Sequence, residues 1–144
     1  MTTAAKTAFG AALWMGPSGG SLVKVAELRS VKPPKMSRGV QDATTHDSPA
    51  GAKEVIPDGT YDPGDIAGKV NYVMGSAGDI AMRAAFLTAA LQDWKIVGKA
   101  ASGTQDLEGT GFLVEYDPAE FGVDGLQMAD FSIKVSGETT QAAT

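Results

Sequence analysis

A strict two-residue alternation of apolar and polar side chains near the C-terminus constrains this chain more than any other feature. The apolar members of the run from Leu126 to Ser136 include Ala129, Phe131, Ile133 and Val135. Successive side chains of a β-strand point to opposite faces of a sheet, so this run predicts a strand with one buried face. The run from Ile66 to Met74 alternates in the same way, and its expected inner face comprises Ile66, Gly68, Val70, Tyr72 and Met74.

One helix is predicted between residues 76 and 92. Ser76 can accept a hydrogen bond at the N-terminus, and Asp79 three residues later completes a box-like start. Alanine and leucine, which favour helices, dominate the residues that follow. Apolar positions recur at helical spacing and are expected to form a stripe that faces the core, comprising Ile80, Ala84, Leu87 and Leu91.

The remaining pattern predicts a mainly β fold. Further strands are expected over residues 22–31, 94–99 and 107–116. Together these elements favour an antiparallel β-sandwich or barrel with one flanking α-helix, formed by a single domain over residues 22–137.

The two ends of the chain are expected to lie outside this domain. Residues 1–21 are predicted to form an N-terminal arm, because they end in a Gly- and Ser-rich joint. Trp14 and Met15 are large apolar side chains for such an arm, so we expect them to pack either on their own domain or on a neighbour. Residues 138–144 are predicted to be a polar C-terminal tail.

Residues 35–65 form a long segment rich in turn-forming Gly, Pro, Asp and Ser. A loop of this length is uncommon inside a compact domain and is usually functional, disordered or a misread element. Residues 53–56 can pair as a short strand, which would turn the segment into an extended hairpin.

Composition excludes several classes of protein. The chain of 144 residues contains no Cys and a single His, so disulfide frameworks, Cys-type zinc sites and multi-His metal sites are ruled out. A net charge of −5 argues against a protein that grips nucleic-acid phosphates. The charge is uneven, +3 over residues 1–57 and −8 over residues 58–144, which is compatible with head-to-tail self-association or with simple scatter over the surface. No apolar run reaches the ~20 residues that a membrane-spanning helix needs.

The groups that resemble catalytic or metal sites have simpler explanations. His46, Asp47 and Ser48 are the residue types of a nucleophilic triad, but sequence neighbours do not easily reach triad geometry. Three carboxylates lack the spacing of a calcium loop and are interpreted as turn formers: Asp58, Asp62 and Asp65. A further three carboxylates fall at no separation that the sequence defines: Glu115, Asp117 and Glu120.

Two other patterns carry little chemistry. The Gly-containing segments 16–24 and 109–111 lack the strand and helix context of phosphate-binding loops. A basic cluster is interpreted as a solvated strand face or an interface to an acidic partner, and it comprises Lys24, Arg29, Lys32, Lys35 and Arg38. We therefore predict no catalytic, cofactor-binding or metal-binding residues.

Several short motifs occur in a particular order around the single helix. They are Val25-Ala26-Glu27-Leu28, the runs Asp42 to Pro49 and Lys53 to Gly59, Asp62-Pro63-Gly64-Asp65, and the run Asp130 to Gly137. Over residues 23–140 this order resembles the tail tube (major tail) proteins of long-tailed, non-contractile bacteriophages and of related tail-like particles.

The resemblance implies a structural virion protein without enzymatic activity or cofactor. Six copies would form a ring around an inner β-barrel, and stacked rings would form the tube through which DNA passes without specific binding. Other partners would be tail proteins at the tube ends and a tape-measure protein inside. The protein would reside in the virion tail after assembly in the host bacterial cytoplasm, with no membrane contact.

The resemblance also gives two segments a role. The long loop would reach the adjacent ring, and its candidate contact residues are Asp42, Thr44, His46, Asp47, Lys53, Glu54 and Asp58. The N-terminal arm would add inter-ring contacts through Trp14 and Met15. The alternative is a small β-barrel binding module that uses residues 35–65 to recognise a ligand or another protein.

Overall fold

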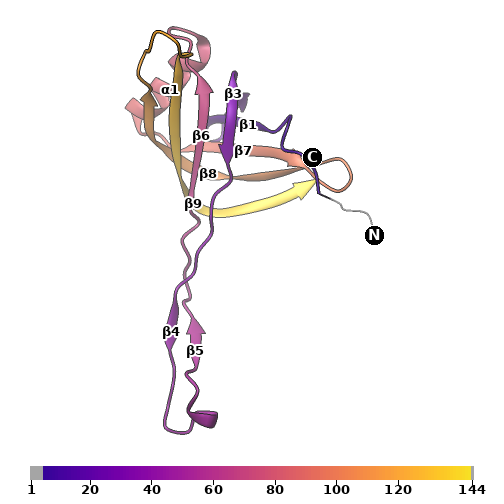
Figure 1. Ribbon diagram of the computed structural model, residues 1–144, viewed down its shortest axis with the longest axis vertical. Helices are drawn as coiled ribbons and strands as arrows, with labels where there is room; N and C mark the ends of the chain where they lie inside the picture. Colours follow the sequence, from indigo (N-terminus) through magenta and orange to yellow (C-terminus); the bar gives the residue numbers. More distant parts are fainter. Residues whose placement is uncertain (1–4, 144) are drawn as a thin grey trace.

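The computed structural model describes residues 5–143 and is mainly β (Figure 1). Seven antiparallel strands form one sheet in the order β2-β1-β7-β8-β9-β6-β3, and two more form a separate hairpin, β4-β5. The strands are β1 (Ala12–Pro17), β2 (Val23–Lys24), β3 (Leu28–Lys32), β4 (Val40–Asp42), β5 (Val55–Pro57), β6 (Asp65–Asn71), β7 (Gln92–Lys99), β8 (Thr104–Pro118) and β9 (Met128–Ala143). One helix, α1 (Ala77–Thr88), and a 3₁₀ turn, Pro49–Gly51, complete the described chain. The predicted mainly β class with one flanking helix is confirmed.

Two long strands, β8 and β9, connect two half-sheets. In the first half-sheet, β7 pairs with residues 104–111 of β8, and these pair in turn with residues 136–143 of β9. In the second half-sheet, residues 128–134 of β9 pair with β6, which pairs with β3. The register of β8 against β9 shifts at Glu108/Thr110 and at Leu113/Glu115. Such bulges bend strands, so β8 and β9 turn from one half-sheet into the other.

The sheet curls because its two edge strands, β2 and β3, are separated by only three residues. Within that short link, the Val25 amide donates to the Leu13 carbonyl of β1 at 2.8 Å. The Glu27 carbonyl accepts from the Asn71 amide of β6 at 2.9 Å, and Glu27 itself has a left-handed φ of 60°. The link therefore joins both edges and closes the body around its core.

The core lies inside this curl. Its most buried large side chains are Leu13, Ile66, Trp94, Phe131 and Ile133. The predicted inner faces of β6 and β9 are confirmed, except that Met74 lies beyond β6 and is exposed. Gly68 is needed at its place because a Cβ there would lie 2.4 Å from the Phe131 ring.

The N-terminal arm predicted over residues 1–21 is wrong for its central part. Residues Ala12–Pro17 form β1, which lies between β2 and β7 inside the sheet. Met15 is buried in the core, and Trp14 is half-buried with the Lys95 ammonium 5.1 Å from its ring centroid. Met15 thus packs in the core of its own domain, because Leu13 and Met15 alternate inward along a strand, while Trp14 on the opposite face packs against Lys95. Residues 1–4 of the predicted arm lie outside the described residues.

The predicted core face of the helix is also wrong. Ile80, Ala84, Leu87 and Leu91 are all exposed, and the helix ends at Thr88, with Ala89 in the left-handed conformation. The buried side chains are instead Asp79, Met82 and Ala85. The Ser76 cap is confirmed, since its hydroxyl accepts from the Asp79 amide at 3.2 Å.

A polar anchor explains this rotation of the helix. The buried Asp79 carboxylate accepts hydrogen bonds from the Tyr116 hydroxyl of β8 at 2.8 Å, the Gly75 amide at 3.0 Å and Arg83 Nε at 3.3 Å. Burial raises the pKa of the Asp79 carboxyl, but these donors outweigh it and the net pKa is lowered. Because the carboxylate is fixed to the sheet, the apolar stripe turns toward solvent.

The C-terminal residues also differ from the polar tail predicted from residue 138, because they form part of a strand. Residues 140–143 continue β9 and pair with residues 105–108 of β8, although all four are exposed. Residue 144 lies outside the described residues. Within residues 5–143, no helix has the length and apolar character required to cross a lipid bilayer.

Candidate assembly interface

The β4-β5 hairpin projects from the curled body along the longest axis of the molecule (Figure 1). Its strands pair as Val40↔Pro57, Gln41↔Ile56 and Asp42↔Val55. The extended hairpin predicted for residues 35–65 is therefore confirmed. An isolated two-stranded ribbon is at best marginally stable in water, so this one depends on bonds along its own length or on a partner.

Three of the predicted contact residues build the ribbon itself. The Asp42 carboxylate accepts from the Thr44 amide at 2.9 Å, and hydrogen bonds from Thr44 lower the pKa of the Asp42 carboxyl. The Thr44 hydroxyl accepts from the Glu54 amide at 2.8 Å across the ribbon. The Asp58 carboxylate accepts from the Gln41 side chain at 3.0 Å. Asp42, Thr44 and Asp58 therefore shape the hairpin from within.

The other predicted residues lie toward the tip. His46, Asp47, Lys53 and the side chain of Glu54 are exposed. Around the tip, the Thr45 amide donates to the Ser48 hydroxyl at 3.0 Å, and the Asp47 amide donates to Thr45 Oγ1 at 3.3 Å. Ser48 thus serves the turn, which agrees with our rejection of a His46-Asp47-Ser48 triad.

The hairpin also carries apolar side chains that the body does not cover. Val40 is 62% exposed, Val55 57% and Ile56 54%. The pairing register puts Val40 and Val55 on one face of the ribbon and Ile56 on the other. Both faces of the hairpin therefore offer apolar surface to a partner.

The neck of the hairpin is braced against β9. Lys134 Nζ lies 3.1 Å from Asp62 Oδ1 and 3.2 Å from Asp65 Oδ1. The Gly64 carbonyl accepts from the Val135 amide at 3.1 Å, and the Gly64 amide donates to Asp62 Oδ1 at 2.9 Å. Both carboxylates raise the pKa of Lys134 through hydrogen bonds, while the Gly64 amide and Lys134 lower the pKa of Asp62.

The neck leaves no room for a side chain at Gly64. Its φ is +90°, and an added Cβ would lie 2.3 Å from the Lys35 carbonyl oxygen on the opposite leg. Sequence reasoning missed Lys134 and Gly64 as positioning residues. The signal was available in part, because Asp62 and Asp65 flank a Pro-Gly turn and Lys134 points outward from a strand.

A second candidate surface is the free edge at the end of β9. In the described part of the chain, residues 136–143 of β9 pair only with β8, since β6 pairs with residues 128–134. The other edge of that half-sheet is the two-residue strand β2. Such edges expose unpaired backbone groups and favour pairing with a strand of another chain.

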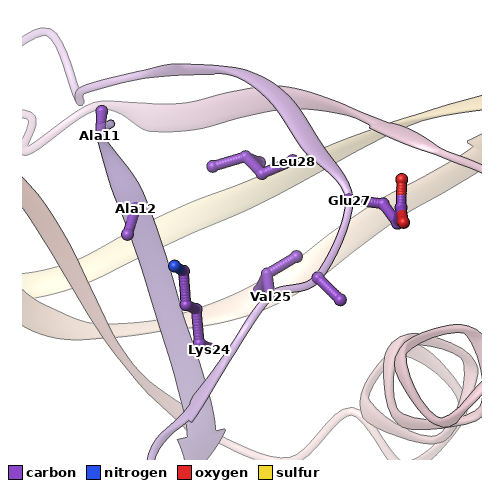
Figure 2. A pocket seen from close by; sticks show the side chains of 7 residues that line it. Ala11, Ala12, Lys24, Val25, Glu27 and Leu28 are labelled. Atoms are coloured by element: carbon purple, nitrogen blue, oxygen red, sulfur yellow. The ribbon is translucent and has the colours of Figure 1, made fainter. Parts of the chain in front are cut away.

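A hollow of about 500 Å³ lies at the seam between β1 and the link that follows β2 (Figure 2). Among the described residues that line it, the charged ones are Lys24 and Glu27, and the Glu27 side chain points away from β1 (Figure 2). The polar groups therefore do not converge on a common point, as they do in small-molecule sites.

The structure also places the remaining carboxylates. Within residues 5–143, no group of three or more His, Asp or Glu side chains is arranged to hold a metal ion. Asp62 and Asp65 do come together, but with Lys134 between them, while Asp58 lies further along the hairpin. Glu115 and Asp117 lie on β8, and Glu120 lies in the loop after it.

Comparisons with known proteins find similarity in the fold and not in the sequence. No protein-family model matches the chain, and no curated protein matches its sequence. Among solved structures, it is similar to a chain from the tail of an empty gene transfer agent particle, computed with C6 symmetry. The TM-score is 0.76 at 16% identity, over 96% of this chain and 100% of that one.

Two further structures share the architecture. A chain of the SPP1 tail tube gives a TM-score of 0.66 at 13% identity, over 96% of this chain and 80% of that one. A chain of the six-fold symmetrised anti-feeding prophage baseplate gives a TM-score of 0.73 at 7% identity, over 99% of this chain and 98% of that one. The chain thus has the fold found in tail tubes and related six-fold assemblies.

Proposed function

We propose that this chain is a structural subunit of a tail tube, in which six copies form a ring and rings stack into a conduit for DNA. The observation that carries the proposal is the shared fold with a C6-symmetric tail, which extends over 96% of this chain and therefore includes most of the hairpin. The role needs no catalytic residue and no cofactor.

Ring formation uses the free edges of the first half-sheet. Residues 136–143 of β9 on one copy pair with the β2 edge of the next, and six such contacts close a barrel. Closure removes the exposed edges that a single copy carries. A contact between two different surfaces of the same chain closes into a ring when its rotation allows.

Tube formation uses the hairpin, which contacts the adjacent ring and covers its own exposed apolar side chains there. Further partners are tail proteins at the tube ends and a tape-measure protein inside the tube. Assembly takes place in the host cytoplasm, and the finished protein resides in the virion tail.

With a net charge of −5 per copy, six copies bring about −30 to each ring. Any part of this charge in the lumen repels DNA phosphates and prevents sticking.

Electron microscopy of the purified full chain, over a range of concentration and salt, tests this proposal. We expect rings about one subunit thick and tubes built from them. A protein that stays monomeric under every condition, and that is absent from purified tails, would contradict it.

A further inference from the structure

The end of the body opposite the hairpin carries a second exposed apolar surface. We call it the far rim and define it by Val73, Met74, Phe121, Val123 and Leu126, all of them exposed, with the acidic residues Asp117, Glu120 and Asp124. Val123 is fully exposed. Phe121 is held against the body by Tyr72, whose ring centroid lies 6.1 Å away.

Strand register places the far rim and the hairpin at opposite ends. β6 begins at Asp65 beside Lys134, where the hairpin joins the body, and ends at Asn71 beside Met128. The far rim follows directly, since Val73 comes just after β6 and residues 119–127 come just before β9. Seven strand residues separate the two ends by about 20 Å. Figure 1 shows the same separation, with α1 and the β8-β9 loop on one side of the body and the hairpin on the other.

The two ends differ in the charges that they leave unpaired. One leg of the hairpin root carries Lys32, Lys35 and Arg38 and no acid, while the other leg carries Asp58, Asp62 and Asp65, of which Asp62 and Asp65 pair with Lys134. Within the described residues, neither Lys32 nor Lys35 makes an ion pair. Residues 117–127 of the far rim contain three acids and no base. Asp117 lies opposite Asp130 across the β8-β9 ladder, and Asp130 in turn lies opposite Lys69 of β6, which leaves Asp117 as the outer acid of this row.

We propose that the far rim is the docking surface for the hairpin and hairpin root of a second copy of this chain in the next ring, which rests on the tube function proposed above. Apolar side chains on the hairpin meet the apolar rim, and Lys32, Lys35 and Arg38 meet Asp117, Glu120 and Asp124. The hairpin projects along the long axis, so a copy displaced along that axis brings these surfaces together (Figure 1). The contact joins unlike surfaces by displacement and therefore repeats without closing.

Charge exchange tests this docking. The variants are Lys32→Glu with Lys35→Glu, Glu120→Lys with Asp124→Lys, and all four changes in one chain. Arg38 is left intact because its guanidinium bonds the Asp58 carbonyl and stacks on Tyr61. Each double variant puts like charges across the ring-to-ring contact, so we expect the concentration needed for tubes to rise about tenfold or more. The fourfold variant restores opposite charges, and we expect tubes to return.

Rings provide the control in the same experiment. Each double variant should still form rings and unfold at the wild-type temperature, because the changed side chains are exposed. If a charge reversal lowers the unfolding temperature, Lys32→Gln with Lys35→Gln replaces it and should weaken stacking by a smaller factor. The docking would be overturned if the wild type forms tubes and the double variants form them at the same concentration. It would also be overturned if the fourfold variant does not recover tube formation. A wild-type chain that forms no rings or tubes would instead overturn the tube function itself.

The absence of cysteine allows a direct second measurement. A chain carrying Ile56→Cys and Val123→Cys places one thiol on the hairpin and one on the far rim. A bifunctional maleimide should crosslink these chains into a ladder when tubes are present and leave monomers uncrosslinked. Chains with only one of the two cysteines are the control and should give no ladder. A ladder missing from well-formed tubes would contradict the proposed contact.

Discussion

The body and the hairpin are both antiparallel β structure, but their stability has different sources. In the body, side chains such as Phe131 and Ile133 are almost completely removed from water. In the hairpin, Val40, Val55 and Ile56 remain more than half exposed, and hydrogen bonds within the ribbon and at its neck hold it together. The body therefore contains its own core, whereas the apolar side chains of the hairpin are exposed in the single chain, and we propose that another copy covers them.

The sharpest contrast comes from removing one apolar side chain from each region. We expect Phe131→Ala to lower the free energy of unfolding by about 3–5 kcal/mol, because it leaves a cavity in the core. We expect Ile56→Ala to change it by less than about 0.5 kcal/mol, since that side chain is already in water. Urea denaturation of the two monomeric variants measures both. Similar losses in the two variants would mean that the hairpin is part of the folded core.

Deleting residues 41–58 removes the hairpin and tests whether the two regions are separable. We expect the shortened chain to keep the circular dichroism and cooperative unfolding of the wild type, because the core contacts lie in the body. We expect no tubes, since the contact with the next ring is gone. Electron microscopy and a thermal melt decide this, and tubes of normal length from the deletion variant would contradict the inter-ring role.

The neck connects the two regions, and Lys134→Met should loosen it. The ion pairs of Lys134 with Asp62 and Asp65 are largely exposed and screened by water, so we expect the free energy of unfolding to change little. Assembly should suffer more, because the hairpin loses its fixed direction. Lys134→Arg is the matched control and should recover tube formation. Equal assembly by the Met and Arg variants would contradict a role for the neck in directing the hairpin.

The last variants concern the anchor of the helix, where no effect on assembly is expected. Tyr116→Phe removes a hydrogen bond to the Asp79 carboxylate and should cost about 1.5 kcal/mol of unfolding free energy. The pKa of the Asp79 carboxyl is lowered in the folded protein, so its carboxylate form stabilises the fold. This stabilisation is fully present above the pKa of about 3.9 in the unfolded chain, and it is lost as the pH falls through the lower pKa of the folded chain. Asp79→Asn should therefore be less stable than the wild type at pH 7, with the difference shrinking below about pH 4. A constant difference across that range in thermal melts would contradict the assigned charge.

The same two regions show what a sequence can predict here. Alternation placed β6 and β9 correctly, because a half-buried strand must alternate whatever its partners are. The helix was located but its buried face was not, since the partner that orients Asp79 is Tyr116, 37 residues away. β1 was mistaken for an arm because Gly and Ala surround its few large side chains. The brace at Lys134 depends on a contact across 72 residues, which no local pattern reports.

Hydrogen exchange in the assembled state tests the central claim most directly, because it reads the hairpin and the body in one experiment. In the monomer, we expect the amides of residues 40–57 to exchange quickly and those of β6 and β9 to exchange slowly. In assembled tubes, the amides of residues 40–57 should become protected, together with residues 119–127 of the far rim. Tubes in which the hairpin exchanges as fast as in the monomer would contradict its role as the link between copies.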